Sequence, residues 1–183
     1  MIPCPNDPCL YRYLYNGSVC FLLLYVDDAL ITGHPIALTQ IQIELKKYFQ
    51  CKFEKPKDFL GLDIQMPCKG EVQLSMHTFT HKMKTVLQIE DSYYGPVLTP
   101  GRTDKKINRT DDIEPNDKYR SHVGSLNWLT MGLRYDLAFV TKELSRVLDK
   151  PTHTANEIVS RALVYAVRTA DAYLRFSHTN MTG

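Results

Sequence analysis

Two adjacent carboxylates, Asp27 and Asp28, are the residues of this sequence best suited to chemistry. They interrupt two apolar runs, residues 19–25 and 29–32. Neighbouring like charges repel and are costly to desolvate unless a cation or strong hydrogen bonds compensate. Mg²⁺ is a hard cation that prefers carboxylate oxygens, so the pair predicts a magnesium site. The alternative is a solvent-exposed Asp-Asp turn, because Asp is a common turn residue.

The flanking runs predict the element that positions this pair. Residues 19–25 are continuously apolar and are typical of a buried strand, and Gly33 ends the second run. A β-hairpin with an acidic tip fits this pattern. A helix over residues 35–49 follows, with basic residues in its last turn.

The remaining segments predict a mixture of strands and helices. Residues 59–64 and 71–75 flank a turn-forming stretch and predict a second hairpin, followed by a helix over residues 78–89. Residues 99–118 contain few large apolar side chains and predict a linker. Three further helices are expected, with Asp136 as an N-cap, over residues 119–133, 136–148 and 155–176. The predicted fold class is therefore α+β.

Composition narrows the class of protein only a little. The 183 residues are 44% hydrophobic and 23% charged, which is ordinary for a globular chain. The net charge of +2 is weaker than the basic bias of most dedicated nucleic-acid-binding domains. None of the five cysteines forms a C-x-x-C motif, so neither a disulfide framework nor a zinc ribbon is indicated.

Two other features have both a functional and a structural interpretation. His77 and His81 have the i, i+4 spacing of zinc ligands on a helix, but Thr78 replaces the expected glutamate and no third ligand is evident. Surface histidines are the favoured interpretation. Trp128 could stack on a nucleic-acid base, although a tryptophan inside an apolar helix is more often a packing residue.

The sequence resembles one known family over nearly its whole length. Residues 24–33, which read LYVDDALITG, resemble the Y-x-D-D hairpin of reverse transcriptases in the form found in copia-type LTR retrotransposons. Further blocks resemble that family in the same order; they are residues 7–11 (DPCLY), 59–64 (FLGLDI), 72–75 (VQLS), 119–129 (YRSHVGSLNWL), 144–146 (LSR) and 151–152 (PT). The ordered series makes the resemblance specific.

This resemblance implies roles for the hairpin tip. Asp27 and Asp28 would hold the two Mg²⁺ ions with which the polymerase palm transfers nucleotides. Tyr25 and Val26 would lie beside the primer terminus and the incoming nucleotide. The implied substrates are deoxynucleoside triphosphates and an RNA or DNA template–primer duplex.

The resemblance also implies a primer grip, the hairpin that positions the primer 3′ end, at Phe59, Leu60 and Gly61. It places the C-terminal half of an incomplete palm first and a helical thumb-like region after it. The expected divisions are residues 1–66 for the palm half, 67–118 for a strand, a thumb helix and a polar linker, and 119–183 for the helical thumb and connection.

The chain departs from the family in ways that bear on activity. The third catalytic aspartate, the fingers, the upstream palm and an RNase H domain are all expected outside this chain. Tyr135 replaces the proline of an R-P-D motif, and Ala155 replaces a histidine. The chain is therefore expected to be inactive alone and to need those missing segments as partners.

Two alternatives remain open. The chain could be a transposon relic that binds nucleic acid or protein without catalysis, or a generic soluble α/β domain of unrelated function in which Asp-Asp is only a polar turn. The family implies a cytoplasmic location in virus-like particles, or a nuclear one, and no membrane partner is expected.

Overall fold

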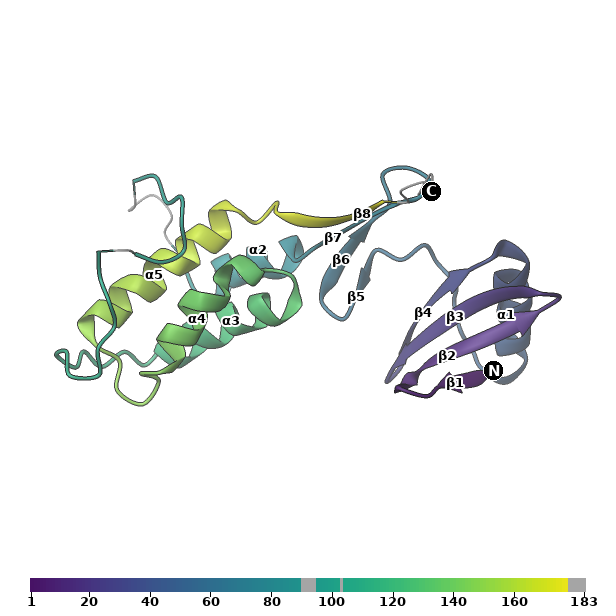
Figure 1. The fold of residues 1–183 in the computed structure, drawn as a ribbon, viewed down its shortest axis with the longest axis horizontal. Coiled ribbons are helices and arrows are strands. Elements are labelled where there is room, and N and C mark those ends of the chain that lie inside the picture. Colours follow the sequence, from purple (N-terminus) through teal and green to yellow (C-terminus); the bar gives the residue numbers. More distant parts are fainter. Residues whose placement is uncertain (90–94, 103, 178–183) are drawn as a thin grey trace, which may run out of the picture. The chain divides into compact units, whose positions relative to one another are not determined.

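The computed structural model describes residues 1–89, 95–102 and 104–177, which form two compact units, Met1–Phe59 and Leu60–Gly183 (Figure 1). Among the described residues, 38% are helical and 26% lie in strands of antiparallel sheets, so the predicted α+β class is confirmed. Within the described ranges, no helix has both the length and the apolar character needed to cross a membrane.

Unit 1 is a four-stranded antiparallel sheet with one helix on it (Figure 1). The strands lie in sequence order, and the helix contacts the second, third and fourth strands. The elements are β1 (Ile2–Cys4), β2 (Asp7–Tyr15), β3 (Ser18–Tyr25), β4 (Asp28–Gly33) and α1 (Pro35–Tyr48).

Local sequence explains most of unit 1. Asn16 and Gly17, with φ of 47° and 72°, turn β2 into β3, because Asn-Gly readily adopts the two left-handed conformations of a type I′ turn. Pro35 occupies the first turn of α1, where its missing N–H has no intrahelical partner in any case. Lys46 and Lys47 lie in the last turn, where the helix dipole favours cations. The predicted hairpin and the helix over residues 35–49 are both confirmed.

The core of unit 1 lies on one side of its sheet only. Its buried residues come from β2, β3 and α1: Tyr13, Cys20, Leu22, Ala37 and Ile41. The prediction of a continuously buried strand was wrong for the alternate residues of β3, and Phe21 remains 39% exposed. Successive strand residues point to opposite faces, and within unit 1 the helix covers a single face.

Gly33 allows the end of β4 to pair closely with β3. It pairs with Cys20, and a Cβ added at Gly33 would lie 2.4 Å from the Cα of Cys20. Its φ of +146° is also a conformation that residues with a Cβ rarely adopt. This position therefore requires glycine for both reasons.

A second antiparallel sheet has the order β5-β6-β7-β8. Its strands are β5 (Asp58–Phe59), β6 (Leu62–Gln65), β7 (Glu71–Ser75) and β8 (Tyr173–Ser177). The helix predicted to continue to residue 176 was wrong at its C-terminal end, because β8 pairs along β7 with Leu174 opposite Leu74 (Figure 1). A strand partner far away in the sequence replaces the local helical pattern there.

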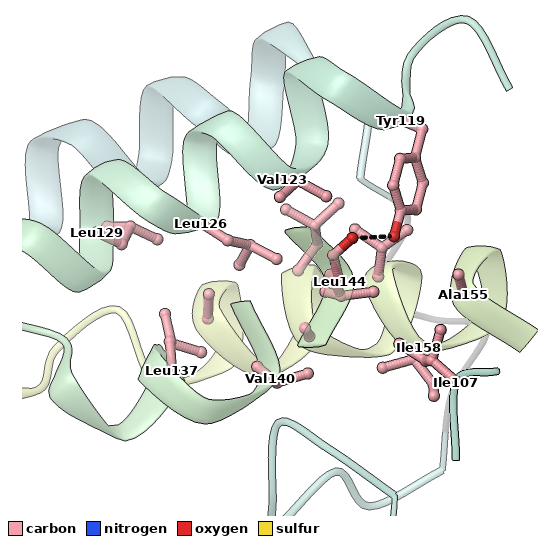
Figure 2. Close-up of a cluster of buried hydrophobic side chains, with 14 of the residues drawn as sticks. Ile107, Tyr119, Val123, Leu126, Leu129, Leu137, Val140, Leu144, Ala155 and Ile158 are labelled. Atoms are coloured by element: carbon pink, nitrogen blue, oxygen red, sulfur yellow. Dashed lines mark hydrogen bonds between the residues drawn. The ribbon is translucent and has the colours of Figure 1, made fainter. Parts of the chain in front are cut away.

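The helices of unit 2 surround the larger core. They are α2 (His77–Val86), α3 (Tyr119–Gly132), the 3₁₀ turn η2 (Tyr135–Leu137), α4 (Ala138–Ser145) and α5 (His153–Arg168). Figure 2 shows Leu126, Leu129, Leu137 and Leu144 converging between α3 and α4. The phenol of Tyr119 donates a hydrogen bond to the carbonyl of Leu144 at 2.9 Å, and burial raises the pKa of this phenol.

Residues 104–118, which fall in the predicted linker, form no helix or strand but lie against the helices. Ile107 is buried in the core of unit 2, and Ile113 forms a β-bridge with Thr152. Lys105 forms an ion pair with Glu157 of α5. These three contacts hold the predicted linker against the helices of unit 2.

Candidate functional site

The acidic pair lies at the tip of the β3–β4 hairpin. Tyr25 and Asp28 pair directly across the two strands, and Val26 and Asp27 form the turn between them. Val26 has a φ of 51°, which is uncommon for a β-branched residue. Tyr25 is 55% exposed, Val26 is 79% exposed, and both aspartates are exposed. The structure therefore brings together all four residues predicted at the tip and leaves them open to solvent.

The strand register fixes the face on which the tip residues lie. Directly paired residues of an antiparallel ladder share one face, so Asp28 lies on the same face as Tyr25. Cys20 and Leu22, which pack against α1, belong to the alternate set of β3. Tyr25 and Asp28 consequently lie on the face that α1 does not cover, where a ligand could approach.

The tip residues fit a hard cation. Asp27 and Asp28 offer only carboxylate oxygens, and their exposure means that no burial cost opposes their charges. Within residues 1–89, 95–102 and 104–177, no three His, Cys, Asp or Glu side chains gather as a ligand set. Mg²⁺ commonly uses one or two carboxylates and completes its shell with water and substrate phosphates, so two carboxylates suit it.

The predicted primer-grip residues form a second tight turn. Phe59 is nearly buried at the end of β5, whereas Leu60 and Gly61, with φ of 54° and 79°, make the turn into β6. The strand predicted over residues 59–64 is thus interrupted by this turn. Leu60 is 41% exposed at its apex, so a leucine rather than a polar residue is presented to solvent.

Trp128 lies beside this turn. A Cβ added to Gly61 would lie 3.3 Å from Cζ2 of the indole, so the glycine gives the ring room. The ring of Phe79 is 6.2 Å away, centroid to centroid, yet Trp128 remains 50% exposed. Trp128 therefore packs at one edge, as predicted, and also keeps an exposed aromatic surface, which the packing interpretation did not anticipate.

Asp63 has a structural role that sequence reasoning missed. Its carboxylate accepts hydrogen bonds from the backbone N–H of Thr78 at 2.9 Å and from the Thr78 hydroxyl at 2.5 Å. A carboxylate at the first turn of α2 satisfies a free N–H group and complements the helix dipole. The two residues are 15 positions apart in the sequence, so no local pattern indicated the contact.

Arg134 and Asp136 form the other interaction that the sequence did not reveal. Arg134 is 4% exposed and donates to both carboxylate oxygens of Asp136, at 3.0 and 2.8 Å. It also donates to the carbonyls of Ala166 and Thr169 at the end of α5. The prediction of Asp136 as an N-cap was wrong, because Arg134 and Leu137 occupy the N-cap positions of η2 and α4, and the Asp136 carboxylate accepts from Arg134. Tyr135, which replaces a proline of the family motif, is largely exposed.

The pKa of Asp136 reflects two opposing causes. Burial raises the pKa of this carboxyl. The hydrogen bonds and the charge of Arg134 lower the pKa by a larger amount, so the net direction is downward. The pair is therefore a charge-assisted tie between the η2 turn and the C-terminus of α5.

The chain is similar in sequence to several transposon proteins. The chain is 29% identical over 170 residues to the retrovirus-related Pol polyprotein from transposon RE2 of Arabidopsis thaliana, covering 91% of this chain and 11% of that protein. It is 28% identical over 173 residues to the putative transposon Ty5-1 protein of Saccharomyces cerevisiae, covering 91% and 54% of the two proteins. It is 30% identical over 173 residues to the retrovirus-related Pol polyprotein from transposon TNT 1-94 of Nicotiana tabacum, covering 87% of this chain and 13% of that protein.

The chain spans only part of these relatives, about a tenth of the plant polyproteins and about half of the yeast protein. No family model and no solved structure matches it. The similarity extends across both units, since it covers about nine tenths of the chain. The relatives therefore support a fragment derived from the Pol polyprotein of a copia-type retrotransposon.

Proposed function

We propose that this chain is the C-terminal palm and thumb segment of an RNA-directed DNA polymerase of an LTR retrotransposon. The observation that carries the proposal is the tip of the β3–β4 hairpin, where Tyr25, Val26, Asp27 and Asp28 are exposed together. Similarity to transposon Pol polyproteins over nine tenths of the chain supports the same function.

Asp27 and Asp28 are assigned the role of metal ligands. Two Mg²⁺ ions bound there in the complete enzyme would activate the attacking 3′-hydroxyl of the primer and stabilise the leaving pyrophosphate. The carboxylates of Asp27 and Asp28 would hold and position the ions, and the exposure of the tip leaves room for triphosphate oxygens and water.

The neighbouring residues are assigned to substrate positioning. Tyr25 and Val26 flank the carboxylates and are exposed, so they can contact the primer terminus and the incoming nucleotide. Leu60 and Gly61 present a tight, apolar turn, and the half-exposed indole of Trp128 lies beside it. A compact turn backed by an aromatic ring suits sequence-independent contact with a primer strand, because stacking and backbone contacts carry no base specificity.

The chain alone is expected to be inactive. The described residues bring two carboxylates to the tip and no third acidic side chain, so we propose that a second Pol segment supplies the further ligand needed to hold two ions together with the substrates. We propose that the template–primer duplex, deoxynucleoside triphosphates and this upstream segment are its partners.

A completed enzyme tests the proposal. The chain should be fused behind the upstream Pol segment of the transposon RE2 relative, and primer extension on an RNA template measured with and without Mg²⁺. We expect Mg²⁺-dependent extension that Asp27→Asn reduces to background, whereas Glu54→Gln, which alters an exposed acid in the loop after α1, leaves extension unchanged.

Extension that survives Asp27→Asn would overturn the assignment of the tip. Absence of extension from a folded fusion, together with nucleic-acid binding that weakens steeply with salt, would overturn the polymerase and indicate a non-catalytic binding fragment.

A further inference from the structure

Two histidine rings lie together at the start of α2. His77 is the first residue of the helix and His81 is one turn later, and their ring centroids are 4.2 Å apart at an interplanar angle of 43°. Nδ1 of His77 lies 3.0 Å from a carboxylate oxygen of Asp171, in the connection between α5 and β8. Three polar side chains from two distant segments of unit 2 therefore meet at one surface position.

The contact with Asp171 determines which nitrogen of His77 is available. A carboxylate accepts hydrogen bonds, so Nδ1 of His77 carries the proton and Nε2 keeps its lone pair when the ring is neutral. A carboxylate behind one histidine is the arrangement that orients imidazole ligands in metal sites.

We propose that His77 and His81 form a surface site for one borderline divalent transition-metal ion such as Zn²⁺, Ni²⁺ or Co²⁺. Residues four apart share a helix face, so both imidazoles can reach one ion, and imidazole nitrogen suits these metals. Asp171 orients His77 without binding the ion, and water fills the remaining positions.

This site differs in chemistry from the carboxylate tip. It offers nitrogen ligands, for which Mg²⁺ has little preference, and it is separate from the proposed polymerase function. The missing glutamate after His77 argues against a hydrolytic zinc enzyme, but it does not bear on a two-histidine binding site.

Calorimetric titration of the full chain with Ni²⁺ tests the proposal, beside His81→Ala, Asp171→Asn and the control His153→Ala. His153 is a matched control because it is also an exposed histidine within 3.2 Å of a carboxylate, that of Glu114. We expect saturable binding of one ion, a loss of about tenfold in affinity for Asp171→Asn, a larger loss for His81→Ala, and no change for His153→Ala.

Two further measurements distinguish binding at the histidine pair from binding at the cysteines or at the carboxylate tip. Co²⁺ bound to the histidines should show no thiolate charge-transfer absorption, which any of the five cysteines would give, and excess Mg²⁺ should not displace Ni²⁺. The proposal is overturned by absent saturable binding, by unchanged affinity in His81→Ala, by loss in His153→Ala, by thiolate absorption or by displacement with Mg²⁺. If His81→Ala fails to fold by circular dichroism, His81→Gln replaces it and the same outcomes apply.

Discussion

The two units bury their family-like residues to very different extents. In unit 2, the block resembling Y-R-S-x-V-G-S-L-x-Y-L supplies Tyr119, Val123, Leu126 and Leu129, which are at most 2% exposed. In unit 1, the block resembling Y-x-D-D supplies side chains at a hairpin tip that are all exposed. The resemblance in α3 falls on residues that pack in the core, whereas the resemblance at the hairpin tip falls on exposed residues that do not.

This difference gives the two similarities different meanings. Core positions resist change because a misfitting side chain creates a cavity or strain, so resemblance there mainly indicates the same fold. Exposed positions are usually tolerant, so we propose that the exposed Tyr-x-Asp-Asp in its unusual turn serves chemistry and not packing. Substitutions in the two units should therefore separate stability from metal binding.

The largest effect on stability is expected for Leu126→Ala in the core of unit 2. Removing this fully buried side chain should lower the free energy of unfolding by about 3 kcal/mol. Urea unfolding followed by the fluorescence of Trp128, the only tryptophan, measures it. Met131→Ala, at a position 76% exposed on the same helix, should stay within about 0.5 kcal/mol. Equal losses would contradict the packing account of this block.

Arg134→Met should have the next largest effect. The substitution keeps an apolar stem but removes the donors to Asp136 and to the end of α5. Because the side chain of Asp136 is 39% exposed, we expect a loss of about 2 kcal/mol, below that of a fully buried pair. The same urea titration applies, and a loss under about 0.5 kcal/mol would show that the tie is dispensable.

The Arg134–Asp136 pair also predicts a pH dependence. The pKa of Asp136 is lowered in the folded chain, so its contribution is complete above the ordinary carboxyl pKa and is lost as pH falls through the lowered value. Unfolding free energies measured from neutral to acidic pH should fall less in Arg134→Met than in the unchanged chain. Parallel curves would contradict this assignment.

Gly33→Ala should destabilise unit 1 by about 2 kcal/mol, through the clash with Cys20 and the positive φ. Hydrogen exchange of β3 and β4 amides measures the effect locally, because unit 1 contains no tryptophan. Gly124→Ala in α3, where an added Cβ meets open space, should instead raise stability by about 0.5–1 kcal/mol. Destabilisation by both changes would show that the open space at Gly124 is needed.

The smallest stability effect is expected for Asp27→Asn. Changing this exposed turn residue should alter the free energy of unfolding by less than about 0.5 kcal/mol. Circular dichroism during thermal unfolding measures it. A clear loss of stability would mean that the acidic tip is a structural turn. The tip would then be needed for folding, as the buried residues of α3 in unit 2 are.

Local patterns predicted the elements whose determinants are close in sequence. The helix beginning at Pro35, the strand β7 and the helix α3 all appear where periodicity and breakers indicated. The hairpin tip was also found, because apolar runs on both sides frame Asp27 and Asp28. The Asn16-Gly17 turn was missed although Asn-Gly is a strong hairpin signal, so β2 could have been predicted too.

The remaining features depend on distant partners. β8 forms because Leu174 meets Leu74, and no window of sequence contains both residues. The roles of Asp63 and Arg134 likewise arise from contacts with other elements. The exposure of the tip could not be predicted from an apolar run, because burial depends on which face of the sheet a helix covers.

The most direct test of metal binding at the hairpin tip is a titration of the chain with Mn²⁺, a paramagnetic ion that shares the oxygen preference of Mg²⁺. Amide resonances should be followed by nuclear magnetic resonance. We expect selective broadening at residues 25–29 that Mg²⁺ competes away and that the double change Asp27→Asn, Asp28→Asn abolishes. Broadening centred on another acidic segment, or unchanged in the double variant, would contradict the claim that this tip is a metal site.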